Sequence, residues 1–136
     1  MRRQSVDTNV LLRAAIQSGD DQTARARALL ADPATTFSVS LLAIAEFVYV
    51  LVAHYGRSRA QAGIVTRWLL AIDSLDCQRN VALAALDAYE THPKLSFEDC
   101  LLAEDARASR ATPLWTFDAK LASQHPAAQL VGTSAS

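Results

Sequence analysis

The chain has 136 residues, 51% of them hydrophobic, and a formal net charge of −1 at pH 7. This length is typical of a single domain, and the apolar share is large enough for a buried core. The nearly balanced charge excludes the strongly basic surface of a general nucleic-acid binder. Because no long apolar run is present, we expect neither a membrane span nor a secretory signal.

The chain has two cysteines, Cys77 and Cys100. Their spacing fits neither a CxxC pair nor a disulfide framework. We therefore expect free thiols and a cytoplasmic location, where thiols are kept reduced.

Short strands alternate with helices along the chain. In order, the pattern predicts a strand over 3–7, helices over 10–16 and 22–31 with a break at 19–21, a strand over 35–39, helices over 41–54 and 59–72, a strand over 75–78, helices over 80–91 and 97–109, a strand over 114–117, a helical turn from 118 and a strand over 129–131. This alternation predicts an α/β fold, a three-layer α/β/α sandwich around a central, mainly parallel sheet. With no linker or repeat, residues 1–136 are expected to form one domain.

Glu46 is the only charged residue between positions 41 and 53. A helix that is apolar on all sides is mostly buried, so Glu46 is expected either at a narrow exposed edge or inside the core. A buried carboxylate must be neutralised, paired or bound to a metal. The plain alternative is an ion pair with an arginine elsewhere in the chain.

Asp99 is the second carboxylate in an unusual place. On a helical wheel it falls with Leu102, Ala103 and Ala106, which predicts that it points toward the core side. The alternative is a helix cap, because Ser96 and Asp99 have the S-x-x-D spacing of a capping motif. Either way, the carboxylate lies at the end of an element.

Asp118 and Asp7 each follow a predicted strand. In open α/β sheets, ligands bind beyond the carboxyl ends of the strands, so both positions suit a site. Each aspartate is also explained by a simple helix N-cap. All four carboxylates being structural would require four independent coincidences.

A divalent cation offsets the repulsion between gathered carboxylates. Oxygen-only ligands suit Mg²⁺ or Mn²⁺. His54, His92 and His125 lie near predicted helix ends or loops and are expected to be surface or capping residues, which argues against zinc.

Four blocks of the sequence resemble one known family. "VDTNVLLR", "SLLAIAEFVYVL", "FEDCLLAEDA" and "TFDAKL" follow the order and spacing of PIN-domain ribonucleases, especially the VapC-type toxins of bacterial toxin–antitoxin pairs. The resemblance implies an α/β/α sandwich that cleaves RNA with Mg²⁺ or Mn²⁺. It also implies a homodimer and a cognate antitoxin that blocks the cleft.

The resemblance implies Asp7, Glu46, Asp99 and Asp118 as catalytic residues. Asp7, Asp99 and Asp118 are expected to hold the metal, and Glu46 either to join them or to orient the attacking water. Asn9 and Thr116 stand where the family places polar groups around the quartet, and Arg13 is a candidate phosphate contact. Trp68 and Trp115 are expected to pack in the core, with base stacking as the alternative.

The sequence departs from the family in two places. Many relatives carry another acidic residue two to four positions after the equivalent of Asp118, where this chain has Lys120, Leu121 and Ala122. The missing carboxylate weakens the case for a second bound metal ion more than the case for the first. The first strand, "RRQS", is also more polar than is common among relatives.

Three other functions compete with the nuclease. An aspartate-nucleophile phosphatase fits Asp7, but such enzymes usually carry a second aspartate two residues later, where this chain has Asn9. A receiver-like signalling domain lacks the expected lysine, in whose place Trp115 and Thr116 stand. The third is a catalytically inactive PIN-like binding module, and the presence of all four acids speaks against it.

Overall fold

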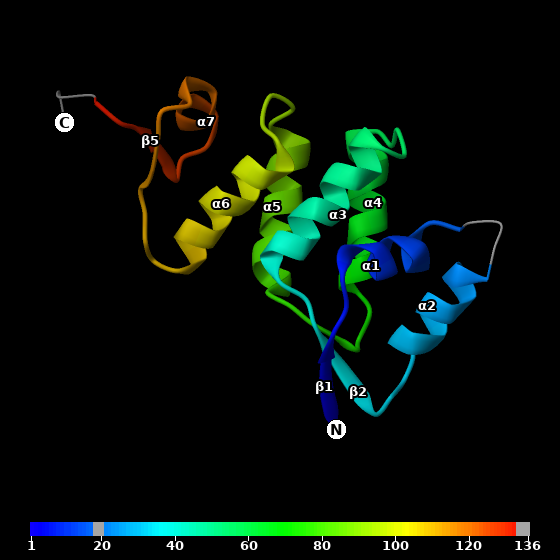
Figure 1. Cartoon of the computed structure of the whole chain (residues 1–136). Coiled ribbons are helices and arrows are strands. Elements are labelled where there is room, and N and C mark those ends of the chain that lie inside the picture. The colour runs from blue at the N-terminus through cyan, green and yellow to red at the C-terminus, as the bar shows by residue number, and fades with distance from the viewer. Residues whose placement is uncertain (18–20, 133–136) are drawn as a thin grey trace. The chain divides into compact units, whose positions relative to one another are not determined.

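The computed structural model describes residues 1–17 and 21–132, so Gly19 and Asp20 of the predicted break lie outside the described residues. The chain divides into two compact units, Met1–Arg79 and Asn80–Ser136, each of which is described by itself. Figure 1 labels the elements of both units along the colour gradient.

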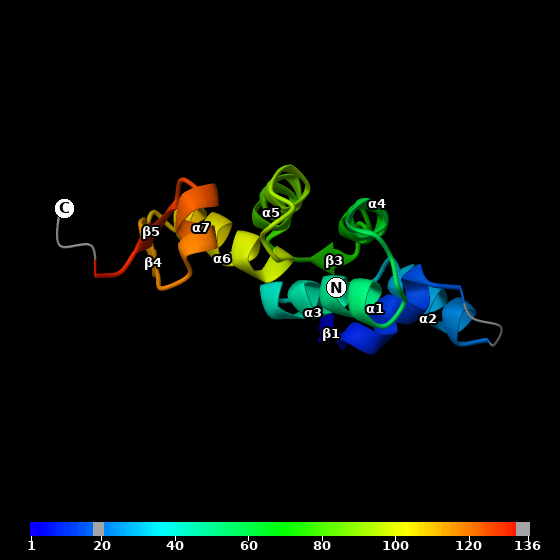
Figure 2. The same cartoon turned by 90° about the horizontal axis from the view of Figure 1, so that it is seen from above.

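Unit 1 has a parallel sheet of three strands in the order β1-β2-β3. Its helices α1 and α3 lie side by side (Figure 2). The apolar side chains of Leu11, Ile44, Phe47 and Leu51 are fully buried and form much of its core. Its elements are β1 (Arg2–Ser5), α1 (Thr8–Ala15), α2 (Gln22–Leu30), β2 (Thr35–Ser38), α3 (Leu41–Ala53), α4 (Arg59–Leu70) and β3 (Leu75–Asp76).

The polar sequence of β1 is explained by its place in this sheet. The strand pairs with β2 on one side, and all four of its residues are exposed. Arg2 forms an ion pair with Asp32 at 3.0 Å, and Arg3 pairs with Asp76 at 2.5 Å. Exposed ion pairs stabilise little, so the backbone ladder with β2 is the main support of the strand.

Two helices of unit 1 begin at the predicted positions, and a serine caps each of them. The hydroxyl of Ser40 accepts a hydrogen bond from the Ala43 amide at 3.1 Å and begins α3. Ser58 and Gln61 form a reciprocal capping box at α4. Each cap satisfies amides that have no partner inside the helix and is worth about 1 kcal/mol.

The helix over 41–53 was expected to be mostly buried, and one of its faces is more exposed than its apolar sequence predicted. Leu42 is 77% exposed and Tyr49 is 66% exposed, on the same side of α3 as Glu46. Positions 42, 46 and 49 follow the spacing of one helix face, so this face meets solvent although it is apolar. Glu46 therefore occupies the exposed edge that the sequence left open.

Unit 2 has two parallel strands, with Leu114 opposite Ala128 and Thr116 opposite Leu130. The rings of Tyr89 and Phe97 pack edge to face in its interior, with centroids 5.8 Å apart. Its elements are α5 (Arg79–Thr91), whose first residue ends unit 1, α6 (Phe97–Ala108), β4 (Leu114–Thr116), α7 (Ala119–Gln124) and β5 (Ala128–Leu130).

Three predictions of core packing are wrong. Trp68 and Trp115 are both exposed, and Leu102, which the helical wheel assigned to the core side, is half exposed. Arg27 lies over the ring of Trp68 at 5.7 Å, so this tryptophan is covered by a cation rather than by the core.

Two smaller predictions concern cysteines and membrane spans. Cys77 and Cys100 are free, as expected. Among the helices in the described part of the chain, none is long and apolar enough to cross a membrane.

Candidate functional site

Asp7 is the N-cap of α1. Its Oδ1 accepts a hydrogen bond from the Val10 amide at 3.1 Å. Its Oδ2 has no partner among residues 1–17 and 21–132. We predicted that the strand before Asp7 runs to position 7, but it ends two residues earlier, at Ser5. The cap interpretation is thus correct, and one carboxylate oxygen stays available for a ligand.

Glu46 projects from the exposed face of α3 in the same unit. The predicted alternative, an ion pair with an arginine, is absent within the described ranges, where the carboxylate makes neither an ion pair nor a hydrogen bond. Both of its oxygens are therefore open to a ligand.

Asp99 lies in the first turn of α6 and is half buried. Its amide donates to the Ser96 hydroxyl at 3.1 Å, so the serine caps the helix through the backbone of Asp99. Its side-chain oxygens have no partner in the described residues. Helix capping explains the role of Ser96, but it does not involve the carboxylate of Asp99.

Asp118 is the N-cap of α7. Its Oδ1 accepts hydrogen bonds from the amides of Lys120 at 2.9 Å and Leu121 at 3.4 Å. Its own amide donates to the Thr116 hydroxyl at 2.9 Å. Thr116 thus fixes the backbone of Asp118 and not its carboxylate.

The four predicted acids are divided evenly between the units, with Asp7 and Glu46 in unit 1 and Asp99 and Asp118 in unit 2. Within the described residues of either unit, no three His, Cys, Asp or Glu side chains form a group that could hold a metal ion.

The predicted polar neighbours occupy α1 and β4. Asn9 is exposed in the first turn of α1, and its side chain has no partner in the described ranges. Arg13 lies in the last turn of the same helix and is half buried, and its Nε atom has no hydrogen-bond partner in the part of the chain that the structure describes.

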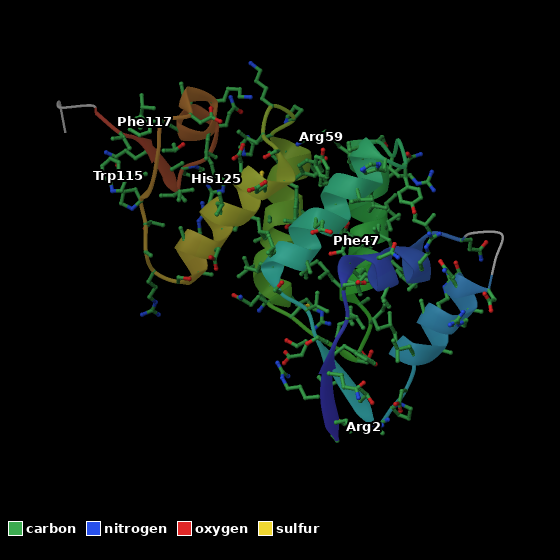
Figure 3. The ribbon with its side chains drawn as sticks, viewed as in Figure 1. Arg2, Phe47, Arg59, Trp115, Phe117 and His125 are labelled. Carbon is green, nitrogen blue, oxygen red and sulfur yellow. The ribbon has the colours of Figure 1, made fainter. Side chains whose placement is uncertain are left out.

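A buried hydrogen-bonded pair in unit 2, His125 and Glu104, was missed by the sequence analysis. The His125 Nε2 atom lies 2.6 Å from the Glu104 Oε2 atom. The residues are only 2% and 8% exposed (His125 is labelled in Figure 3). His125 is the C-cap of α7, as its position suggested, but it is not a surface residue. A signal for Glu104 was present, because Cys100 and Leu101 lie one turn before it on a buried face.

Two pKa shifts occur outside the quartet. A hydrogen bond from the Ala34 amide and another from the Thr35 hydroxyl lower the pKa of Asp32. Burial raises the pKa of the Cys77 thiol, so this cysteine is protonated at neutral pH and a poor nucleophile.

The PIN domain family model matches residues 5–124, and the chain therefore belongs to the PIN domain family. A search of curated proteins found no relative that matches the chain. The matched range contains all four acids and extends across both units.

The family match and the parallel strands confirm the predicted α/β class, consistent with an α/β/α sandwich. PIN domains are generally nucleases, which are hydrolases that act on nucleic acids, and they typically use divalent metal ions.

Proposed function

We propose that this chain is an endoribonuclease that depends on Mg²⁺ or Mn²⁺ and uses Asp7, Glu46, Asp99 and Asp118 as its catalytic carboxylates. The observation that carries the proposal is that each acid inside the PIN match keeps at least one carboxylate oxygen with no partner among the described residues. A helix cap needs only one carboxylate oxygen, so the second oxygen of Asp7 and of Asp118 stays accessible to a cation. That both units form one domain with one site is part of the proposal.

The donor set fits a hard divalent cation. All candidate ligands are carboxylate oxygens, which suit Mg²⁺ and Mn²⁺ better than zinc. We assign Asp7, Asp99 and Asp118 to the metal, and Glu46 either to the metal or to the attacking water. When bound, such an ion lowers the pKa of water and stabilises charge on the phosphoryl oxygens.

The residues of the chain supply the positions for this chemistry. The helix starts at Asp7 and Asp118 fix those two carboxylates through backbone amides. Thr116 holds the backbone at Asp118. Glu46 is suited to accept a proton from water, since none of its oxygens is engaged by another described group. Asn9 and Arg13 are candidates for contacts to the phosphate backbone.

Metal removal tests this function. We expect purified chain, freed of any partner, to cut structured RNA at defined positions in Mg²⁺ or Mn²⁺. EDTA should reduce the rate to that of buffer alone, and added Mn²⁺ should restore it. Equal cleavage in EDTA would contradict the proposal. No cleavage with either metal by folded protein would favour an inactive binding module.

Two exposed aromatic residues are candidates for contact with RNA bases. Trp115 is 56% exposed and Phe117 is 83% exposed, at alternate positions directly before Asp118 (Figure 3). Residues 107–131 contain three Lys or Arg residues and one carboxylate. The net charge of this stretch is therefore positive, which favours binding of RNA phosphates. Exposed aromatic rings stack on unpaired bases at about 1–3 kcal/mol per base.

The Phe117→Ala substitution should therefore weaken binding of single-stranded RNA about tenfold, measured in EDTA so that the RNA is not cleaved. Phe117→Trp should retain the affinity, whereas Phe117→Leu should lose it although it keeps the apolar bulk. Fluorescence anisotropy with a labelled oligonucleotide measures all three. Equal affinities for the leucine and tryptophan variants would mean that stacking plays no part.

We further propose that the chain is a cytoplasmic toxin that forms a homodimer and is blocked by a cognate antitoxin. The exposed apolar side chains of α3 and α4, with Leu42, Tyr49 and Ile64 among them, are suited to a protein interface. Induced expression in bacteria should stop growth, and the Asp7→Asn variant should relieve the arrest. Growth arrest by both proteins alike would contradict a nuclease toxin.

A further inference from the structure

The buried pair of Glu104 and His125 joins two elements that each carry a proposed metal ligand. Glu104 belongs to α6, and His125 directly follows α7. Their side chains meet at 2.6 Å, and both residues are more than nine-tenths buried. Arg107 reaches the other oxygen of Glu104 only loosely, at 3.9 Å. The histidine is therefore the close partner of this carboxylate.

The second nitrogen of the imidazole is also engaged. The Ala127 amide donates to Nδ1 at 3.0 Å, so Nδ1 carries no proton and Nε2 donates to Glu104. The Ala127 carbonyl in turn accepts a hydrogen bond from the Leu114 amide at 2.7 Å. His125 is thus bonded on one side to α6 and on the other to the turn that leads into the β4–β5 sheet.

The Glu104–His125 hydrogen bond joins segments of unit 2 that carry two of the proposed metal ligands. Asp99 precedes Glu104 by five residues, which is about 7.5 Å along α6. Asp118 stands between β4 and α7 and is fixed to β4 through Thr116. The Glu104–His125 bond therefore links the helix that carries Asp99 with the strands and helix that carry Asp118.

We propose that Glu104 and His125 are positioning residues that set the separation of the Asp99 and Asp118 carboxylates, an inference that rests on the proposed function. A buried polar pair adds little stability compared with apolar residues of similar volume. A directional hydrogen bond, in contrast, fixes the orientation of two elements. Functional side chains must be held to within about 0.5 Å, and α6 and α7 meet this need through the pair.

The test compares two variants of nearly the same shape. Glu104→Gln keeps an acceptor for His125, whereas Glu104→Met removes it without leaving a buried charge. Mn²⁺ affinity of the full chain, measured from the electron paramagnetic resonance signal of free Mn²⁺, is the readout. We expect about tenfold weaker binding for the methionine variant and wild-type affinity for the glutamine variant.

Further variants separate position from stability. His125→Asn keeps an acceptor for the Ala127 amide but does not reach Glu104. It should therefore weaken Mn²⁺ binding as much as Glu104→Met does. If Glu104→Met does not fold, His125→Asn takes its place in the test. Leu86→Ala removes buried apolar volume from α5 of the same unit and should leave the affinity unchanged in folded protein.

Asp99→Asn distinguishes the two ways of failing. If this variant loses Mn²⁺ while Glu104→Met and His125→Asn bind it like the wild type, the positioning role is overturned and the proposed function stands. If Asp99→Asn binds Mn²⁺ as tightly as the wild type, or the wild type binds none, the proposed metal site fails and the positioning role fails with it.

Discussion

Replacing Asp99 by asparagine should lower the rate of RNA cleavage by about 10³-fold or more while the protein stays folded. Asparagine has nearly the same shape but lacks the negative charge that holds a divalent cation. Loss of a metal ligand removes about 4 kcal/mol of transition-state stabilisation, which corresponds to this factor. Cleavage of a labelled RNA in Mn²⁺ under single-turnover conditions measures the effect.

The neighbouring acid provides the matched control. Glu98 lies in the same first turn of α6 but is exposed on another face. Glu98→Gln should change the rate by less than twofold, although it removes the same charge from the same helix start. A comparable loss in both variants would mean that helix electrostatics, and not a ligand, underlies the effect of Asp99.

Replacing His125 by alanine should lower the free energy of unfolding by about 3 kcal/mol. The substitution leaves the buried Glu104 carboxylate without its close partner, and it also removes the acceptor of the Ala127 amide. For a chain of this size, the melting temperature should fall by about 10 °C. Urea denaturation followed by circular dichroism gives the free energy directly.

Two controls test the reason for this loss. His54→Ala removes an exposed histidine at the end of α3 and should stay within about 0.5 kcal/mol of the wild type. The double variant His125→Phe with Glu104→Met replaces both partners by apolar groups and should recover most of the lost stability. A double variant no more stable than His125→Ala would mean that the unpaired Glu104 carboxylate is not the cause of the loss.

Local signals in the sequence predicted most element boundaries. Ser40, Ser58 and Ser96 each begin a helix where they were expected, because a cap depends only on amides three residues away. The short strands were also found, and the one with the strongest local signal is β2, which begins with the β-branched Thr35 and Thr36. Even the polar first strand was recognised, although it ends at Ser5 rather than at position 7.

Burial was the weaker part of the sequence analysis because it depends on distant neighbours. The apolar sequence of α3 suggested a buried helix, yet Leu42 and Tyr49 face solvent. His125 was expected to be a surface or capping residue; it caps α7, but it is buried against a carboxylate from a helix that ends 17 residues earlier in the chain. Neither result follows from periodicity, since periodicity defines a face but not what covers it.

In the candidate site, too, local features were predicted from the sequence and long-range ones were not. Capping geometry at Asp7 and Asp118 follows from local sequence and is present. The grouping of the four acids rests on the resemblance to PIN domains, because Asp7 and Glu46 belong to one unit and Asp99 and Asp118 to the other. No spacing along the chain fixes how such distant positions meet.

The most direct test of the central claim maps RNA cuts for one variant from each unit. Asp7→Asn and Asp118→Asn, run beside the wild type in Mn²⁺ and in EDTA, ask whether both halves of the chain serve one reaction. We predict metal-dependent cuts at the same positions in the wild type and their loss in both variants. Persistence of those cuts in either folded variant would contradict a single site built from the four carboxylates.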